Sequence, residues 1–311
     1  MNRRSVSISA LAISLLLPSA AALAQQAVAG GLAVQVAPHA YVVSDQGRNL
    51  VLIADSAGAM VAGVQAPALV AKARQALAAL HAGPVRYALL MDGPGAPGFL
   101  DGGWEGRGAL ALAHEGLRGQ IRAAVRDTVT RAPAGTRLPS MGYSEVVQVQ
   151  LGGEEAHCVK QHPGYSRADA AIHFEGAGLL YLNSLTMDGY PDIDVAHGGT
   201  LAGMAETAAA FATNFASFPE AIEPIVPARG PLASIRELGE FRDMLIAVHD
   251  RVEKLLDEGK TVDQAVAAHP TADLDARWGR GPVTPERFVR TAYAAIQAER
   301  AAEAEERAHS H

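Results

Sequence analysis

The sequence has only one cysteine, Cys158, and contains no recognisable pattern for an activated nucleophile. A single cysteine excludes an intramolecular disulfide. The chain also lacks a Gly-x-Ser-x-Gly elbow and a Ser-x-x-Lys pair, which excludes the common serine-hydrolase arrangements. Residues 156–159 alternate in polarity like a strand, so we predict that Cys158 is a buried thiol. A reactive or dimer-forming thiol is the alternative.

Basic clusters are missing as well. The 26 lysines and arginines are outnumbered by 33 aspartates and glutamates, giving a net charge of −7. An acidic chain without a basic patch argues against nucleic acid or an anionic membrane as a partner. The glycine-rich segment 93–103 lacks the Gly-Lys-Ser/Thr ending of phosphate-binding loops.

The N-terminal segment 1–24 is typical of a secretory signal peptide. Arg3 and Arg4 precede an apolar stretch at 10–17 and a small-x-small cleavage site that ends at Ala24. The apolar stretch is too short for a stable membrane span. We predict a periplasmic or secreted protein in which residues 25–311 form a single domain, with a net charge of −9 once Arg3 and Arg4 are removed.

Periodicity predicts strands and helices in two successive halves. Strands are expected at 32–43, 49–54, 85–91, 108–113, 145–151, 156–161, 168–174 and 179–182, and helices at 67–80, 115–131, 201–215, 232–256, 262–268 and 285–304. Pro67 suits a first helical turn, while Thr261 with Gln264, and Thr284, are helix-capping signals. Two halves of this kind favour two packed sheets with helices on both outer faces.

Ten short segments spaced along the mature chain carry a family likeness: residues 36–38, 65–67, 84–87, 113–115, 151–155, 169–174, 189–194, 198–200, 241–245 and 270–278. In these segments the chain resembles exported bacterial proteins of the metallo-β-lactamase fold. The resemblance implies an α/β fold, a four-layer αββα sandwich, with a helical C-terminal extension from about residue 232. Active relatives hydrolyse lactam, lactone, thioester or ester bonds with zinc that activates water.

The residues that replace the family's zinc ligands do not suit zinc. The resemblance places the ligand positions on Asp92, Pro94, Ala96, Pro97, Tyr165, Asn183 (or Ser184 after a one-residue gap) and Arg229. Proline and alanine carry no donor atom. At about 4 Å and an effective dielectric constant of about 20, Arg229 would repel a divalent ion by about 8 kcal/mol. We therefore predict that the chain binds no zinc and no other cofactor.

The same residues suggest a remodelled pocket. We predict that Asp92, Tyr165, Asn183, Arg229 and His197 form a binding site without catalytic residues. In this hypothesis Arg229 replaces the cation and pairs with Asp92, while Tyr165 and Asn183 add hydrogen bonds. His197 is the one histidine considered for acid–base chemistry at the pocket mouth. The alternative is that the pocket has collapsed and these residues lie on its rim.

The remaining histidines are interpreted as structural. His157 and Cys158 point to opposite faces of a strand, so they and His162 are not expected to share a metal. We predict that His114 caps or packs at the start of a helix, and that His173 packs on a strand.

These observations leave three hypotheses for function. The first is a metal-free pseudoenzyme that binds a small anionic molecule, such as a carboxylate, or a protein partner. The second is an acyl-bond hydrolase that works metal-free or with one atypically bound ion. The third is a structural subunit that acts through its surface.

Overall fold

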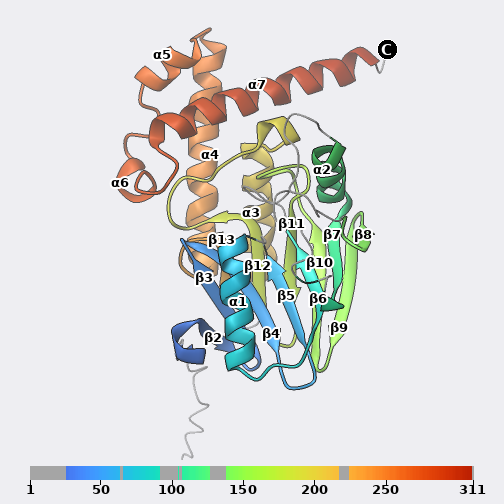
Figure 1. Cartoon of the computed structure of the whole chain (residues 1–311). Helices are drawn as coiled ribbons and strands as arrows, with labels where there is room; N and C mark the ends of the chain where they lie inside the picture. Colours follow the sequence, from blue (N-terminus) through green and yellow to red (C-terminus); the bar gives the residue numbers. More distant parts are fainter. Residues whose placement is uncertain are drawn as a thin grey trace, which may run out of the picture.

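The computed structural model describes residues 26–63, 66–91, 104, 107–126, 138–216 and 224–309. The predicted signal peptide and Asp92 lie outside the described residues. Within the described part, the chain forms one continuous 13-stranded β-sheet that is flanked by helices (Figure 1).

The sheet runs in the order β8-β7-β6-β5-β4-β13-β12-β11-β10-β9, and β3, β2 and β1 continue in that order from β4. The strands are β1 (Gln26–Val28), β2 (Ala33–Ala37), β3 (Ala40–Asp45), β4 (Arg48–Ala54), β5 (Ala59–Gly63), β6 (Val85–Leu90), β7 (Leu110–His114), β8 (Met141–Tyr143), β9 (Val146–Leu151), β10 (Glu154–Lys160), β11 (Ala170–Phe174), β12 (Leu179–Thr186) and β13 (Ile225–Arg229). Pairing is parallel from β5 through β8 and between β12 and β13. The predicted strands are present, except that the single strand predicted at 32–43 is two strands, β2 and β3, because the chain turns at Pro38 and His39, where His39 has a φ of 59°. Strands β1, β5, β8 and β13 were not predicted.

The predicted helices begin close to their expected starts, whereas the short helix Asp275–Trp278 was not predicted. The helices are α1 (Pro67–Ala79), α2 (Glu115–Arg126), α3 (Leu201–Ala216), α4 (Ile235–Asp257), α5 (Val262–Ala267), α6 (Asp275–Trp278) and α7 (Pro285–His309), with 3-10 turns η1 (Ala29–Gly31) and η4 (Val195–His197). The capping signals are confirmed. Pro67 opens α1, Thr261 and Gln264 form a capping box, and Thr284 Oγ1 accepts from Arg287 N at 3.2 Å.

Strand alternation divides the interior into three cores. On β4, Leu50 and Leu52 face α1, while Val51 and Ile53 face the opposite half of the sheet. On β12, Leu180 packs toward α3 and α4, while Tyr181 packs into the same middle core as Val51. A middle core between two sheet halves, with a helix-covered core outside each, is the predicted four-layer αββα sandwich.

Buried Cys158 lies in the middle core, and its exposed fraction is 1%. Burial raises the pKa of its thiol to about 12. The thiol is therefore protonated at neutral pH and shielded from solvent. The prediction of a buried strand thiol is confirmed.

The two sheet halves meet at a narrow junction. β13 pairs with β4 at one position, where Arg229 lies opposite Arg48. Buried Asn49 reinforces this junction, because its Nδ2 donates to the carbonyl oxygens of Pro227 at 2.9 Å and Gly230 at 2.8 Å. A side chain thus replaces ladder hydrogen bonds where the strands diverge.

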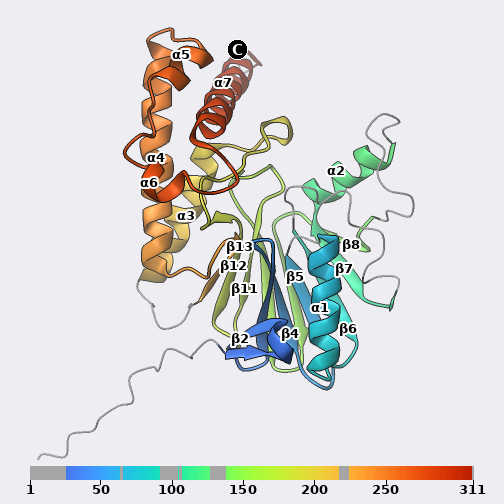
Figure 2. The same cartoon turned by 60° about the vertical axis from the view of Figure 1, so that its left-hand side comes forward.

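The helical C-terminal extension is present and packs on the second half of the sandwich (Figures 1 and 2). Tyr190 stacks on Phe288 of α7 with ring centroids 4.5 Å apart, and its hydroxyl donates to Asp275 Oδ1 at 2.8 Å. These contacts fasten α6 and α7 to the loop that follows β12. Among the described helices, none combines the length and apolar character that a membrane span requires.

Candidate functional site

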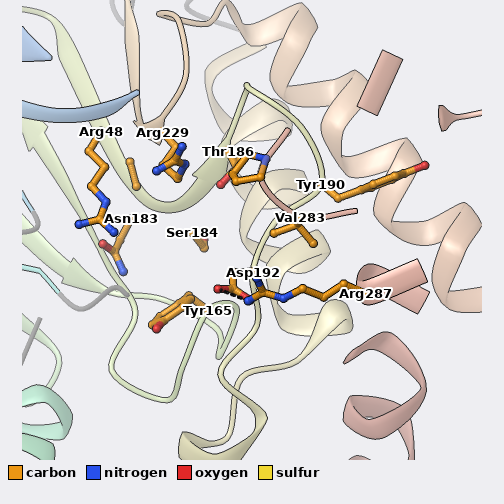
Figure 3. Close-up of a pocket in the computed structure, with 12 residues that line it drawn as sticks. Arg48, Tyr165, Asn183, Ser184, Thr186, Tyr190, Asp192, Arg229, Val283 and Arg287 are labelled. Carbon is orange, nitrogen blue, oxygen red and sulfur yellow. Dashed lines mark hydrogen bonds and ion pairs between the residues drawn. The ribbon is translucent and has the colours of Figure 1, made fainter. Parts of the chain in front are cut away.

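A cavity of about 160 Å³ opens where β12 and β13 end, beside the C-terminal extension (Figure 3). Three predicted site residues, Tyr165, Asn183 and Arg229, line it together. Three of the five predicted residues thus lie together at one cavity, and its role as a binding site stays a prediction. Asp92 lies outside them, and its predicted contact with Arg229 stays a prediction.

His197 does not line this cavity. It lies on η4 with about half of its side chain exposed, and its Nδ1 is 2.7 Å from Asp194 Oδ2. Its carbonyl oxygen accepts from Arg167 N at 3.0 Å, and Gly198 follows it at a φ of 78°. We therefore interpret His197 as part of the turn that supports the cavity, whereas the sequence placed it at the mouth.

Buried Asp169 holds the cavity floor in place. Its carboxylate accepts the backbone N–H of Tyr165 at 2.6 Å and of Gly164 at 3.1 Å, and the amide of Asn183 at 3.1 Å. Charge-assisted bonds of this kind are strong and offset the cost of burying a carboxylate. Asp169 thus positions two of the predicted residues. The sequence marked it only as part of a family-like segment.

The Oδ1 of Asn183 is buried and has no hydrogen-bond partner within the described structure. Because Nδ2 is committed to Asp169, the carbonyl oxygen is the end of this amide that remains available. An unsatisfied buried acceptor costs about 1–3 kcal/mol. A hydroxyl or N–H group from a ligand or water would remove that cost.

Arg229 pairs with Asp188, a residue that the sequence did not single out. Arg229 Nη2 lies 2.9 Å from Asp188 Oδ2, and about a quarter of each side chain is exposed. Gly47 makes room for the pair. It adopts a φ of +76°, and a Cβ there would approach Asp188 Oδ2 to 3.0 Å and Arg229 Nη2 to 3.2 Å.

Arg48 lies directly opposite Arg229 across the strand junction and lines the same cavity (Figure 3). Like charges directly opposite on neighbouring strands are destabilising. Asp188 compensates Arg229, but half-buried Arg48 makes no ion pair or side-chain hydrogen bond within the described residues. Among the described residues, its guanidinium is the one arginine charge of the cavity that no carboxylate pairs with.

The C-terminal extension supplies the opposite wall. Nη2 of Arg287 on α7 donates to both carboxylate oxygens of Asp192, at 2.9 and 3.0 Å, and Val283 adds an apolar surface. Among the residues that the structure describes, three arginines and two aspartates thus lie in or beside the cavity, and Arg48 is the arginine without a carboxylate partner. The sequence predicted the extension but not its part in this site.

The described donor set does not fit a dinuclear zinc centre. No histidine or cysteine lines the described part of the cavity, and both oxygens of Asp192 are taken by Arg287. Asn183 is neutral, and two guanidinium groups that cannot lose their protons would repel the ions. The one group of His, Cys, Asp and Glu with metal-ligand geometry in the described structure lies elsewhere, at Glu155, His157 and Glu175.

His114 behaves as the sequence predicted. It ends β7, its Nδ1 accepts from Gly116 N at 3.1 Å, and its Nε2 is 3.0 Å from the carbonyl oxygen of Ser144. Burial lowers its pKa, so the neutral ring is favoured. His114 therefore caps and packs at the start of α2.

No family model matches the chain, and no curated protein sequence matches it. Among solved structures, it is similar to the stereoselective inverting sec-alkylsulfatase Pisa1 from Pseudomonas sp., with 12% identity and a TM-score of 0.61 over 84% of this chain and 49% of that one. A double mutant of the same enzyme gives 14% identity and a TM-score of 0.61 over 86% and 50%. A motif mutant of a metallo-beta-lactamase from Cronobacter sakazakii has 16% identity over 89% and 97%, but its TM-score of 0.48 is too low to carry an argument.

These likenesses show the fold and nothing finer. The chain spans about half the length of the alkylsulfatase structure. The predicted fold class, a mixed α/β metallo-β-lactamase-type sandwich with a helical C-terminal extension, is confirmed.

Proposed function

We propose that this chain is an exported protein of the metallo-β-lactamase fold that has no zinc centre in the cavity beside Arg48 and binds a small organic anion there. The observation that carries the proposal is the Arg48–Arg229 pair, in which only Arg229 has a carboxylate partner within the described residues. An anion placed at Arg48 would remove the like-charge repulsion at the sheet junction. A guanidinium is also well suited to bidentate binding of a carboxylate or a sulfate.

The cavity also limits the size and character of the ligand. About 160 Å³ holds roughly five waters at about 30 Å³ each, which suits a molecule of a few carbon atoms. Ala228, Pro282 and Val283 give it an apolar side, while Asn183 Oδ1 offers an acceptor. The expected ligand is therefore a short apolar group that carries one negative charge.

Binding is favoured over hydrolysis because the described wall lacks a general base. Ser184 and Thr186 provide hydroxyl groups, but no histidine lines the described cavity and Asp192 is held by Arg287. A nucleophilic hydroxyl requires an adjacent base to activate it. Asp92, outside the described residues, is the remaining candidate for the hydrolase hypothesis.

The test is a calorimetric titration with sec-butyl sulfate and with butanoate. The first probe follows from the sec-alkylsulfatase named among the similar structures, and sec-butanol is its neutral control. We expect both anions to bind at one site and sec-butanol not to bind. Arg48→Met should weaken binding about 10- to 100-fold, because a hydrogen bond to a charged group contributes about 1.5–3 kcal/mol. Arg122→Met, which removes an exposed arginine on α2, should leave binding unchanged.

Two outcomes would contradict the proposal. Equal binding by the wild type and Arg48→Met would place the anion elsewhere. Release of sulfate from the ester in the presence of a chelator, lost in Asp92→Asn, would identify a metal-free hydrolase instead.

A further inference from the structure

Three side chains that suit a metal ion gather on the second half of the sandwich. The ligand atoms of Glu155, His157 and Glu175 all lie within 4.8 Å of one another. His157 Nε2 is 2.9 Å from Glu155 Oε1 and 3.5 Å from Glu175 Oε2. The anion cavity uses none of these residues.

Strand register brings them together. Glu155 and His157 are two residues apart on β10, so they share one face of the sheet. His157 lies opposite His173 of β11. The same register, continued by the hydrogen bond from Glu175 N to Glu155 O, places Glu155 opposite Glu175. The result is a two-by-two array in which Glu155 faces Glu175 and His157 faces His173.

The array places like charges opposite each other. Two carboxylates on neighbouring strands repel, which costs stability unless a positive charge lies between them. His157 Nε2 occupies that position. It is shielded from solvent and makes no hydrogen bond, although Glu155 Oε1 is at contact distance. His157 Nε2 therefore lies close to the oxygens of Glu155 and Glu175, but its geometry is not that of a hydrogen bond to either of them.

A neighbouring amide fixes one of the carboxylates. Gln150 Nε2 donates to Glu155 Oε2 at 2.7 Å, so Oε1 is the oxygen left to face His157. Such outer partners orient ligands in metal sites. The ring of His173 lies 6.0 Å from that of His157, centroid to centroid.

From this geometry we propose that Glu155, His157 and Glu175 bind a divalent transition-metal ion of the zinc class. One imidazole nitrogen and two carboxylate oxygens are a zinc ligand set, and water can fill the remaining position. A cation there also neutralises the two opposed carboxylates. Alkaline-earth ions, which prefer oxygen alone, should bind less well.

This site is separate from the anion cavity. Glu175 lies before the turn that leads into Leu179 at the start of β12, whereas Asn183 is four residues further along that strand. At about 3.3 Å per residue, that is about 13 Å of strand beyond the turn. The two proposals can therefore fail independently.

The experiment is a titration of the untagged, chelator-treated protein with Zn²⁺, in competition with a zinc-sensitive dye. We expect the wild type to bind one Zn²⁺ with a Kd below about 10 µM. His157→Ala should weaken this binding at least about 100-fold, and Glu175→Gln about 10-fold or more. Mg²⁺ at a 100-fold higher concentration should not displace the Zn²⁺.

Two controls separate this site from other zinc-binding groups. His162→Ala removes an exposed histidine that pairs with Glu206 at 3.0 Å, and it should leave zinc binding unchanged. His309→Ala tests the histidine-containing C-terminal tail and should also have no effect. Arg48→Met should alter anion binding but not zinc binding.

Several results would overturn the proposal. They are a wild-type Kd above about 100 µM, equal zinc binding by the wild type and His157→Ala, and displacement of Zn²⁺ by Mg²⁺. If His157→Ala does not fold, Glu175→Gln decides the matter, because the Glu175 side chain is 64% exposed and its loss leaves the packing intact. Unchanged binding in Glu175→Gln would then be the contradicting result.

Discussion

The two ends of β12 show opposite charge arrangements. Where β12 ends, Arg48 lies opposite Arg229 across the β4–β13 junction. Near where it begins, Glu155 of β10 lies opposite Glu175, just beyond β11. Each is a pair of like charges on neighbouring strands, which lowers stability when nothing of opposite charge is bound. The comparison suggests that the sandwich carries one place for an anion and another for a cation.

The two pairs differ in how much of their charge is neutralised by neighbouring side chains. Within the described residues, Asp188 pairs with Arg229, whereas Arg48 has no carboxylate partner. At the other pair, His157 stands between two carboxylates and contacts both. If the comparison holds, removing one member of either pair should stabilise the ligand-free protein and weaken the corresponding binding.

The largest expected effect on stability comes from Asp169, which supports only one of the two regions, the anion cavity. Asp169→Ala should lower the free energy of unfolding by about 4 kcal/mol, because it leaves several buried N–H donors without an acceptor. Urea unfolding followed by circular dichroism measures the change. Asp169→Asn, which keeps one acceptor oxygen, should lose less. A loss below about 1 kcal/mol would contradict the role assigned to this carboxylate.

A second prediction tests whether Asp188 compensates the arginine pair. Asp188→Ala should destabilise the protein by about 1 kcal/mol, a value discounted because the pair is partly exposed to solvent. In an Arg48→Met background the same substitution should cost less, because Asp188 then has only Arg229 to compensate. A double-mutant cycle in urea measures this difference. Additive effects would show that Asp188 does not interact with Arg48.

A third prediction compares the two pairs directly. Without ligands, Arg48→Met and Glu175→Gln should each raise the free energy of unfolding by about 0.3–1 kcal/mol, as expected when opposed like charges are separated. Added NaCl should reduce both gains by screening. The exposed variant Arg122→Met should show no gain. A loss of stability in either variant would show that the like-charge pair it removes does not destabilise the ligand-free protein.

The smallest effect concerns pH. Burial lowers the pKa of His114 and, with a contribution from nearby His157, that of His173. The unfolded chain therefore binds these protons more readily than the folded chain. The histidines' contribution to stability is complete above about pH 6.5 and declines as the pH falls toward their lowered values. Urea midpoints at pH 7.5 and 5.0 should differ less in His114→Asn than in the wild type, and equal differences would contradict this assignment.

Local sequence signals predicted much of the fold. Pro67, the Thr261 capping box and strand alternation act over a few residues, and the structure confirms them. β13 was missed because Pro227 and Gly230 made its segment look like a loop. Its single pairing with β4 joins residues far apart in sequence, so no local pattern predicts the Arg48–Arg229 contact.

The candidate site was predicted only in part, because some of its residues are far apart in sequence and no local pattern connects them. Family-like positions identified Tyr165, Asn183 and Arg229, which do line one cavity. Arg48, Asp188 and Arg287 come from three other elements, and only tertiary packing brings them there. The histidine and carboxylates near the start of β12 are assembled by cross-strand register, whereas the sequence had suggested that His157 was purely structural.

The most direct test of the central claim is zinc-edge anomalous diffraction from crystals grown with Zn²⁺ and sec-butyl sulfate. The account predicts a zinc peak between Glu155, His157 and Glu175, no zinc peak beside Asn183 and Arg229, and sulfate density at Arg48. A zinc peak within the cavity lined by Asn183 and Arg229 would contradict it.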